Sequence, residues 1–476
     1  MIHPYDDAGQ FWLPDDPERK VGGSISYVPG ERPMLRLTGS FNSMDSELKL
    51  LANWHIPHEE KIVLGRVAKG REVTLCGCRS SNEGVIDLEF GGVVTKGLDV
   101  ATVFRGLHLV TEDELAFARF EVELSHLGEW ADLFRIEPGM CPRVEEGVHA
   151  VGYRLPEAIG AVLGNGWLLR FGVNVRGPSR SRPQRAITVT PTAVVELRPP
   201  TRRTLQEGVD QVRIVSTFLS LAAQQPSVAR RLSVFPGGSA AERDPRMPEL
   251  GVTVLYQNPD VARQPKDLVP PHDFLFVLAD MEVPEKHLRS WEQATAEIGS
   301  TVNLYMAELR EPGIHLEPRF LRFVQALEGY HRRRFDNAAV AETEHDARLT
   351  EILAASPEKH RDWLAGKLKY SNEPCLAARI AELCRVYAPV VDKIDRKRSW
   401  CERVADIRNR LSHQTTGVSE REIGEILTVT ERMKLVLDLC LLSECGFGAE
   451  QIRQLVERYW RRHPPLLAVD ATQLLH

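Results

Sequence analysis

Two residues in the stretch "IRNRLSHQTTG" are well suited to catalysis, Arg408 and His413, which lie five positions apart. A histidine transfers protons near neutral pH because its unperturbed pKa is about 6.5. An arginine stays positively charged and can hold an anion through two parallel hydrogen bonds. The pair predicts either acid–base chemistry beside an anion or, as the alternative, the polar end of an ordinary helix, where the dipole favours a histidine.

The spacing alone does not identify a site, because an arginine followed five residues later by a histidine occurs three times in the chain. The copy at positions 310–315 contains a proline and a glycine, and the copy at 458–463 runs into two prolines. Both contexts disrupt a helix. Only the copy at 408–413 combines a continuous helical pattern, a polar Asn409 directly after the arginine, and a tight reversal into the next helix.

An apolar stripe positions this helix. Trp400, Val404, Ile407 and Leu411 recur at spacings of three and four, so they fall on one buried face. The arginine and the histidine of the pair are then about 140° apart around the helix axis and about 7.5 Å apart along it. They cannot lie side by side on one helix face. Asn409, four residues before the histidine, can lie beside His413 on the same face.

The turn after the helix has its own signals. Gly417 is a plausible stop residue, and Ser419 with Glu422 forms a capping box in "SERE". Val418 and Ile423 stand where a hydrophobic staple packs. The catalytic pair is therefore expected at the mouth of a helical bundle and not in its middle.

The chain changes character at Pro284, and helical patterns follow one another from there to about Arg462. Their short connections predict an antiparallel bundle over residues 284–476. The patterns are "FLRFVQALEGYHRRRF", "PCLAARIAELCRVYAPVVDKI", "RSWCERVADIRNRLSH", "SEREIGEILTVTERMKLVLDLCLL" and "AEQIRQLVERYWRR".

Residues 1–200 are predicted to form a β-rich domain, mostly antiparallel, because short alternating segments are separated by Gly and Pro. Helical interruptions are expected at "TEDELAFARF" and "LPEAIGAVL". A connecting region at 201–283 combines an amphipathic helix ending at Gln225 with strand-like runs at "VARRLSVFP", "GVTVLYQN" and "DFLFVLADM". The fold class is therefore α+β.

Composition limits the classes of function. With 43% hydrophobic and 26% charged residues the chain is globular, and its net charge of -6 argues against nonspecific coating of nucleic acid. No apolar run is long enough for a membrane span, and the acidic start does not resemble a secretory signal, so we expect a cytoplasmic location. The eight cysteines include Cys76 and Cys78, but two ligands fall short of the usual four, so free thiols are the preferred interpretation and metal binding stays open.

The stretch "RNRLSH" within a helical bundle resembles the R-x(4–6)-H motif of HEPN ribonucleases, in which a polar residue typically follows the arginine. The order of segments adds to this likeness. The opening "FWLPDDPERKVGGSISYVPGERPMLRLTGSF", the middle "FLRFVQALEGYHRRRF" and the terminal bundle together resemble the ApeA family of bacterial anti-phage abortive-infection proteins.

The resemblance implies a metal-independent endoribonuclease without cofactors, which acts as a homodimer or higher homo-oligomer through the HEPN domain. Arg408 and His413 would be catalytic, with Asn409 orienting the imidazole or binding a phosphate oxygen. RNA, with transfer RNA favoured, would be the substrate, and a phage protein is a candidate trigger for the N-terminal region. The basic cluster is predicted to contact RNA, with a solvated helix end as the alternative; its residues are Arg332, Arg333, Arg334 and Arg410.

Two other functions remain open at this point. The bundle could be a noncatalytic HEPN-type dimerisation module that carries a β-rich ligand-binding or protein-binding domain. The β region could also be a carbohydrate-binding sandwich, which its strand content and Trp12, Trp54 and Trp167 would support. The arginine-rich loop "RGPSRSRPQR" is interpreted as a mobile basic hairpin in preference to a specific site.

Overall fold

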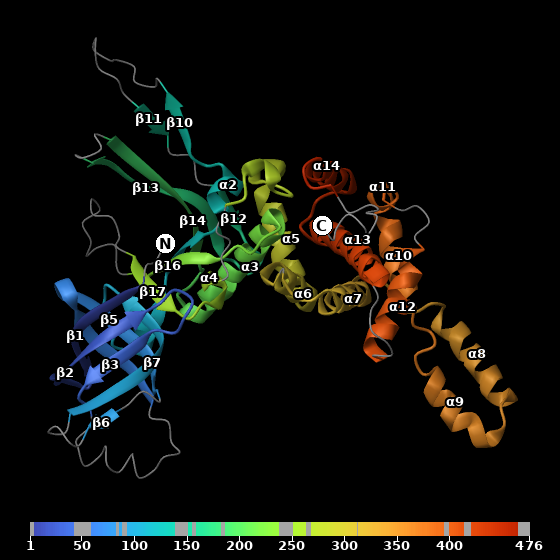
Figure 1. Ribbon diagram of the computed structural model, residues 1–476, viewed down its shortest axis with the longest axis horizontal. Helices are drawn as coiled ribbons and strands as arrows, with labels where there is room; N and C mark the ends of the chain where they lie inside the picture. The colour runs from blue at the N-terminus through green and yellow to red at the C-terminus, as the bar shows by residue number, and fades with distance from the viewer. Residues whose placement is uncertain are drawn as a thin grey trace. The chain divides into compact units, whose positions relative to one another are not determined.

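The fold was analysed in a computed structural model, which describes residues 4–41, 59–81, 85–87, 93–138, 151–154, 159–181, 186–237, 251–262, 268–311, 313–394, 399–413 and 420–464. The chain divides into two compact units, residues 1–289 and 290–476. The first unit is rich in antiparallel strands and the second is helical, as the sequence predicts (Figure 1). The class is α+β.

A 13-stranded sheet dominates the first unit, in the order β12-β13-β14-β9-β16-β17-β7-β3-β2-β1-β4-β5, with β6 paired to β7. Its strands are β1 (Tyr5–Leu13), β2 (Asp16–Tyr27), β3 (Met34–Thr38), β4 (Glu59–Val67), β5 (Arg71–Ser80), β6 (Val85–Asp87), β7 (Val93–Arg105), β9 (Arg119–Leu124), β12 (Ile159–Val162), β13 (Leu168–Ser181), β14 (Ala186–Arg198), β16 (Ala229–Phe235) and β17 (Val252–Tyr256). Two small pairs stand apart from it, β8 (Ala116–Phe117) with β15 (Arg203–Thr204) and β10 (Arg135–Pro138) with β11 (Val151–Arg154).

Part of this sheet closes on itself. Strand β5 pairs with β7 as well as with β4, so β7, β3, β2, β1, β4 and β5 form a closed circuit of antiparallel pairs. Its interior is apolar, and Phe11, Leu35, Leu75 and Val103 are fully buried there. Burying each such side chain stabilises the fold by about 1.5–3 kcal/mol.

Helix α3 (Leu205–Ala223) begins with a complete capping box. The Thr204 hydroxyl accepts a hydrogen bond from the Glu207 amide, while the Glu207 carboxylate accepts from the amide and hydroxyl of Thr204. The helix ends at Ala223, two residues before the predicted end, and Gln224 follows it in the left-handed conformation. Two shorter helices in this unit are α2 (Leu127–Ala131) and α4 (Pro259–Ala262).

Two local expectations for the first unit are wrong. The segment "LPEAIGAVL", expected to be helical, contains strand β12, because Ile159–Val162 pairs in antiparallel register with β13. The segment "DFLFVLADM", expected to be a strand, begins at the last residue of a 3-10 turn, Pro271–Asp273, and contains a second one, Leu278–Asp280. Its apolar residue Phe276 is nevertheless buried. Burial and not sheet pairing therefore accounts for this apolar run.

The helices that follow are α5 (Pro284–Glu297), α6 (Gly299–Arg310), α7 (Leu316–Arg334), α8 (Glu342–Ala355), α9 (Arg361–Leu368), α10 (Leu376–Val386), α11 (Ala388–Val391), α12 (Trp400–His413), α13 (Glu420–Glu444) and α14 (Ala449–Trp460). Within the second unit α7 packs against α6 and α13, and α10 packs against α12. Helix α13 is central, since Leu437, Leu439 and Leu441 are all fully buried. No helix in the described ranges is long and apolar enough to cross a membrane.

A helical hairpin interrupts the bundle between α7 and α10. Figure 1 shows α8 and α9 side by side, extending away from α10 and α12. The hairpin exposes large side chains, with Trp363 64% and Tyr370, just after it, 66% accessible. The helical patterns named from the sequence leave residues 336–373 unassigned, so both α8 and α9 and their projection from the bundle are findings of the structure.

Candidate functional site in the helical unit

The apolar stripe of α12 is buried as predicted. Trp400, Val404 and Ile407 are at most 4% accessible, and Leu411 is half-buried. This face packs against α10, with a smaller contact to α7. The stripe therefore fixes the rotation of α12 about its own axis, which decides where its polar residues point.

Arg408 and Asn409 lie on the exposed side of α12. The Arg408 guanidinium donates a hydrogen bond from Nη1 to Asn409 Oδ1 at 3.1 Å. Among the residues that the structure describes, no carboxylate pairs with Arg408. Because one amide oxygen neutralises no charge, this arginine presents a full positive charge to solvent.

The other two arginines of α12 are paired with α13. Arg403 donates to both carboxylate oxygens of Glu425, with Nη2 to Oε2 at 2.8 Å, and this pairing lowers the pKa of Glu425. Arg410, a predicted RNA contact, forms an ion pair with Glu422. These two ion pairs, before and after Arg408 in the sequence, hold α12 to α13. Two arginines of α12 therefore have a structural role, and the third, Arg408, is open to a ligand.

His413 is the last residue of α12. Its side chain, like the following residues Gly417, Val418 and Ser419 of the predicted turn, lies outside the part of the chain that the structure describes. The predicted capping box and hydrophobic staple therefore stay predictions. The backbone shows that the arginine and the histidine belong to one continuous helix, as the sequence predicts.

The three arginines at the end of α7 all have partners within the helical unit. Arg332 pairs with Glu328 at 3.2 Å and with Glu373 at 2.7 Å. Arg333 donates to the Glu297 carbonyl at 2.9 Å. Arg334 donates to both oxygens of the Glu444 carboxylate at 2.7 Å, which, with its bond to Glu297, raises the pKa of the guanidinium. Contact with RNA stays a prediction for these arginines, and each would have to bind RNA while it keeps its partner within the helical unit.

A buried polar network lies beside this basic cluster, centred on His331. Its imidazole is fully buried and stacks on Phe335. Arg379 of α10 donates to His331 Nδ1 at 3.0 Å, and Glu382 lies 2.8 Å from Nε2. An arginine can only donate, so Nδ1 is the acceptor and Nε2 carries the proton that Glu382 accepts. His331 is therefore neutral, and burial lowers its pKa.

Arg379 extends the network to the residues that flank the α8–α9 hairpin. Only 1% accessible, it donates to Asn337 Oδ1 at 2.6 Å and to Glu373 at 3.2 Å. Glu328, three residues before His331 on α7, pairs with Arg332 and not with the imidazole. The signal for the observed arrangement is present in the sequence as an arginine and a glutamate three residues apart on α10, but only the packing of α10 on α7 shows their partner.

The two neighbouring cysteines of β5 do not share a face. Cys78 lies in the apolar interior of the strand circuit, while Cys76 lines a cavity outside it. Gly77 between them has φ +63°, a left-handed conformation that interrupts the alternation of the strand. Among the described residues there is no group of three or more His, Cys, Asp and Glu that could hold a metal ion.

The tryptophans proposed for a carbohydrate site do not present an open surface. Trp12 and Trp167 are buried, at 9% and 5% accessible, and Trp54 lies outside the described residues. A sugar stacks on an exposed aromatic face, which neither described residue offers. The tryptophans therefore no longer support the carbohydrate-binding hypothesis.

Two family models match the chain. The model described as ApeA N-terminal domain 1 matches residues 8–291, which is more than half of the chain. The model described as Apea-like HEPN matches residues 321–451, a range that contains α12 with Arg408 and His413. No curated protein and no solved structure matches. The first match covers almost the same residues as the first structural unit, and the second match lies within the second unit.

Proposed function

Because the chain belongs to the ApeA family and carries an Apea-like HEPN domain, a pairing that supports an anti-phage HEPN-type effector, we propose that it is a metal-independent endoribonuclease. Its action would be abortive infection by cleavage of cellular RNA, with transfer RNA as the favoured substrate. The N-terminal unit would sense infection or restrain the nuclease, and a phage protein is the proposed trigger.

The observation that supports this proposal most directly is the state of Arg408. It is exposed, it lies within the HEPN match, and it has no acidic partner among the described residues, whereas Arg403 and Arg410 on the same helix both have one. A guanidinium free of a carboxylate can bind a phosphate group through charge-assisted hydrogen bonds. His413 at the end of the same helix supplies the titratable group.

The proposed reaction is attack of an RNA 2′-OH on the adjacent phosphodiester. The bond from O2′ to phosphorus forms, the bond from phosphorus to O5′ breaks, and the products are a 2′,3′-cyclic phosphate and a 5′-OH. One proton leaves O2′ and one reaches O5′, and His413 is suited to move either of them. Arg408 would stabilise the charge on the phosphoryl oxygens, and Asn409 would orient the imidazole or bind one of those oxygens.

HEPN domains typically dimerise and act on RNA. Positions 408 and 413 of one helix are about 140° apart around its axis, so a compact site is easier to build from two copies than from one. We propose a homodimer, or a higher oligomer, in which the two motifs face each other. A single-stranded loop suits such a cleft because its bases can be splayed and its 2′-OH aligned.

The test expresses the full chain and its variants and follows both cell growth and RNA integrity. Arg408→Ala and His413→Ala are each expected to lower cleavage by about a hundredfold or more, since both remove a group that acts in the transition state. Asn409→Ala is expected to have a smaller effect. The matched control is Arg461→Ala, an exposed arginine at the end of α14 outside the proposed site.

Loss of cleavage in the first two variants, with normal folding by circular dichroism, supports the proposal. Unchanged cleavage in both would reject it and leave the noncatalytic dimerisation module as the better description. Purified wild-type protein is expected to cut equally well in EDTA, and loss of cutting there would reject the metal-independent mechanism.

A further inference from the structure

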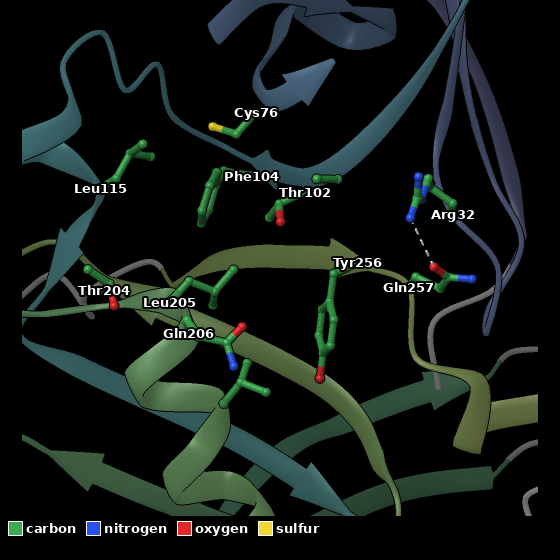
Figure 2. Close-up of a pocket in the computed structure, with 12 residues that line it drawn as sticks. Arg32, Cys76, Thr102, Phe104, Leu115, Thr204, Leu205, Gln206, Tyr256 and Gln257 are labelled. Atoms are coloured by element: carbon green, nitrogen blue, oxygen red, sulfur yellow. Dashed lines mark hydrogen bonds between the residues drawn. The ribbon is translucent and has the colours of Figure 1, made fainter. Parts of the chain in front are cut away.

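A cavity of about 610 Å³ opens in the first unit, whereas the residues proposed for catalysis belong to the second. Figure 2 shows the residues that line it, which come from β5, β7, β17, the start of α3, the turn between β2 and β3, and the 3-10 turn Glu112–Leu115. Its volume is that of a pocket for a small organic molecule. Neither family match assigns it a ligand.

One wall is a row of side chains across three strands. Thr102 of β7 pairs with Cys76 of β5 on one side and with Tyr256 of β17 on the other. Phe104, two residues further along β7, also lines the cavity, but it is only 2% accessible and forms part of its floor. The wall therefore presents one partly exposed aromatic ring, that of Tyr256, together with a hydroxyl and a thiol (Figure 2).

The first turns of α3 form the opposite wall. Leu205 and Gln206 lie there in Figure 2, and Val209 lines the cavity one turn later. The Gln206 amide is already bonded to Asp210 at 3.1 Å. The capping box at the start of α3 fixes this wall, so the cavity is formed before any ligand arrives.

The charge of the cavity comes from one residue. Of the twelve described residues that line it, Arg32 is the only one charged at neutral pH. Burial raises the pKa of the Cys76 thiol and of the Tyr256 phenol to about 12, so both stay neutral. The Arg32 guanidinium has one long hydrogen bond, 3.4 Å to Gln257 Oε1, which leaves further N–H groups for a ligand (Figure 2).

From this arrangement we propose that the cavity binds a small organic anion with a planar ring. The ring would lie between the strand wall and α3, beside the partly exposed ring of Tyr256, since aromatic side chains favour flat partners. The anionic group, a carboxylate or a phosphate, would pair with Arg32 at the rim. This ligand site is separate from the proposed nuclease, because all of the described residues that line it belong to the first unit.

The experiment measures binding of named probes to the purified full chain by isothermal titration calorimetry. Indole-3-acetate is the carboxylate probe, adenosine 5′-monophosphate is the phosphate probe, and indole-3-acetamide is the neutral analogue. At least one anion is expected to bind with a dissociation constant below about 5 mM, and the amide at least about tenfold more weakly. Binding is the readout, so the result does not depend on RNA cleavage.

Two variants locate the site. Arg32→Gln removes the charge and is expected to weaken the anion about tenfold or more, the loss of one charge-assisted hydrogen bond. Val209→Trp fills the cavity from the half-buried side of α3 and is expected to abolish binding. Arg170→Gln, an exposed arginine of the same unit that does not line the cavity, is the matched control and should bind as the wild type does.

Carboxylate binding alone, phosphate binding alone, or both would identify the anion and support the proposal when Arg32→Gln weakens it. The proposal is overturned if neither anion binds below about 5 mM, if the amide binds as tightly as the acid, or if Arg32→Gln and Val209→Trp both leave the affinity unchanged.

Discussion

Among single residues, the three arginines of α12 differ in their hydrogen-bonding partners, which the sequence pattern does not reveal. Arg403 and Arg410 each meet a glutamate of α13 and hold two helices together. Among the residues that the structure describes, the one partner of Arg408 is the amide oxygen of its neighbour, Asn409. An exposed ion pair contributes little to stability, about 0–1 kcal/mol. The more important difference is that Arg403 and Arg410 are occupied by glutamates, whereas Arg408 can bind a ligand.

The buried imidazole of His331 predicts a stability that depends on pH. Its folded pKa lies below the unfolded value of about 6.5, so the unfolded chain binds the proton more readily. The free energy of unfolding is therefore full above about pH 6.5 and falls as the pH drops from there toward the folded pKa. Protonation would also place a second cation against the Arg379 guanidinium, which now donates to Nδ1.

We expect urea denaturation to show this loss of stability in the wild type between pH 7 and pH 5. His331→Gln removes the titrating group and should show a smaller loss over the same interval, whatever its stability at pH 7. His360→Gln, an exposed histidine of the same unit, serves as the control and should keep the wild-type slope. Equal slopes for the wild type and His331→Gln would refute the prediction.

At the scale of elements, the α8–α9 hairpin is an insertion whose two ends are hydrogen-bonded to each other. Asn372, in the segment that leaves the hairpin, bonds to the segment that enters it. Its carbonyl accepts from the Ala339 amide at 2.6 Å, its Oδ1 accepts from the Val340 amide at 3.0 Å, and its Nδ2 donates to the Val340 carbonyl at 3.1 Å. Arg379 adds a second tie through Asn337 and Glu373. The bundle is thus complete without the hairpin tips.

These bonds at the base of the hairpin predict that it can be shortened without unfolding the helical unit. Replacing residues 347–365 with a short Gly-Ser turn keeps both His345, which bonds Ser371 at 2.9 Å, and the bonds of Asn372. We expect the melting temperature to stay within about 4 °C of the wild type, a shift of roughly 1 kcal/mol. Asn372→Ala in the full chain should cost more than the deletion, because it removes the side-chain bonds to Val340.

A large fall in melting temperature for the shortened chain, with no fall for Asn372→Ala, would show the reverse: that the hairpin stabilises the bundle and its base does not. Differential scanning fluorimetry of the two variants beside the wild type is sufficient to decide between these outcomes.

The elements also show how far sequence pattern reaches. The period of apolar residues predicts α3, α7, α12 and α13, because each buries a stripe that recurs at helical spacing. It fails at β12 and at the run around Phe276, where a short apolar segment has no period long enough to separate strand, helix and buried turn. The apolar stripe predicts that Asn409 lies on the opposite, polar side, but it leaves Arg408 near the border of the stripe, so the exposure of Arg408 is a finding of the structure. The partners of His331 and the ligand cavity are not predicted, because both arise only when distant segments pack.

For the whole molecule, the central proposal is that one chain's Arg408 works with another chain's His413. This can be separated from a site within one chain by mixing two inactive variants. A heterodimer of Arg408→Ala with His413→Ala has one intact arginine and one intact histidine, on different chains. If the site is shared, this heterodimer regains one working site of two.

We therefore expect co-expression of the two variants to restore RNA cleavage to about a quarter of the wild-type level, since random pairing makes half of the dimers mixed and each has half of its sites intact. Each variant expressed alone at twice the dose is the control and should stay inactive. Continued inactivity of the mixture, with mixed dimers demonstrated by differently tagged chains, would reject the shared site.

The pairing of strand β7 has a consequence for the design of truncated fragments of this protein. Beyond its partnership with β3, β7 is hydrogen-bonded to β17, which continues through β16 to β9. A chain shortened at residue 200, where the β-rich pattern of the sequence ends, would lack both β16 and β17. It would leave two bare sheet edges, on β7 and on β9, which are templates for aggregation. The smallest soluble N-terminal fragment should therefore extend past Tyr256.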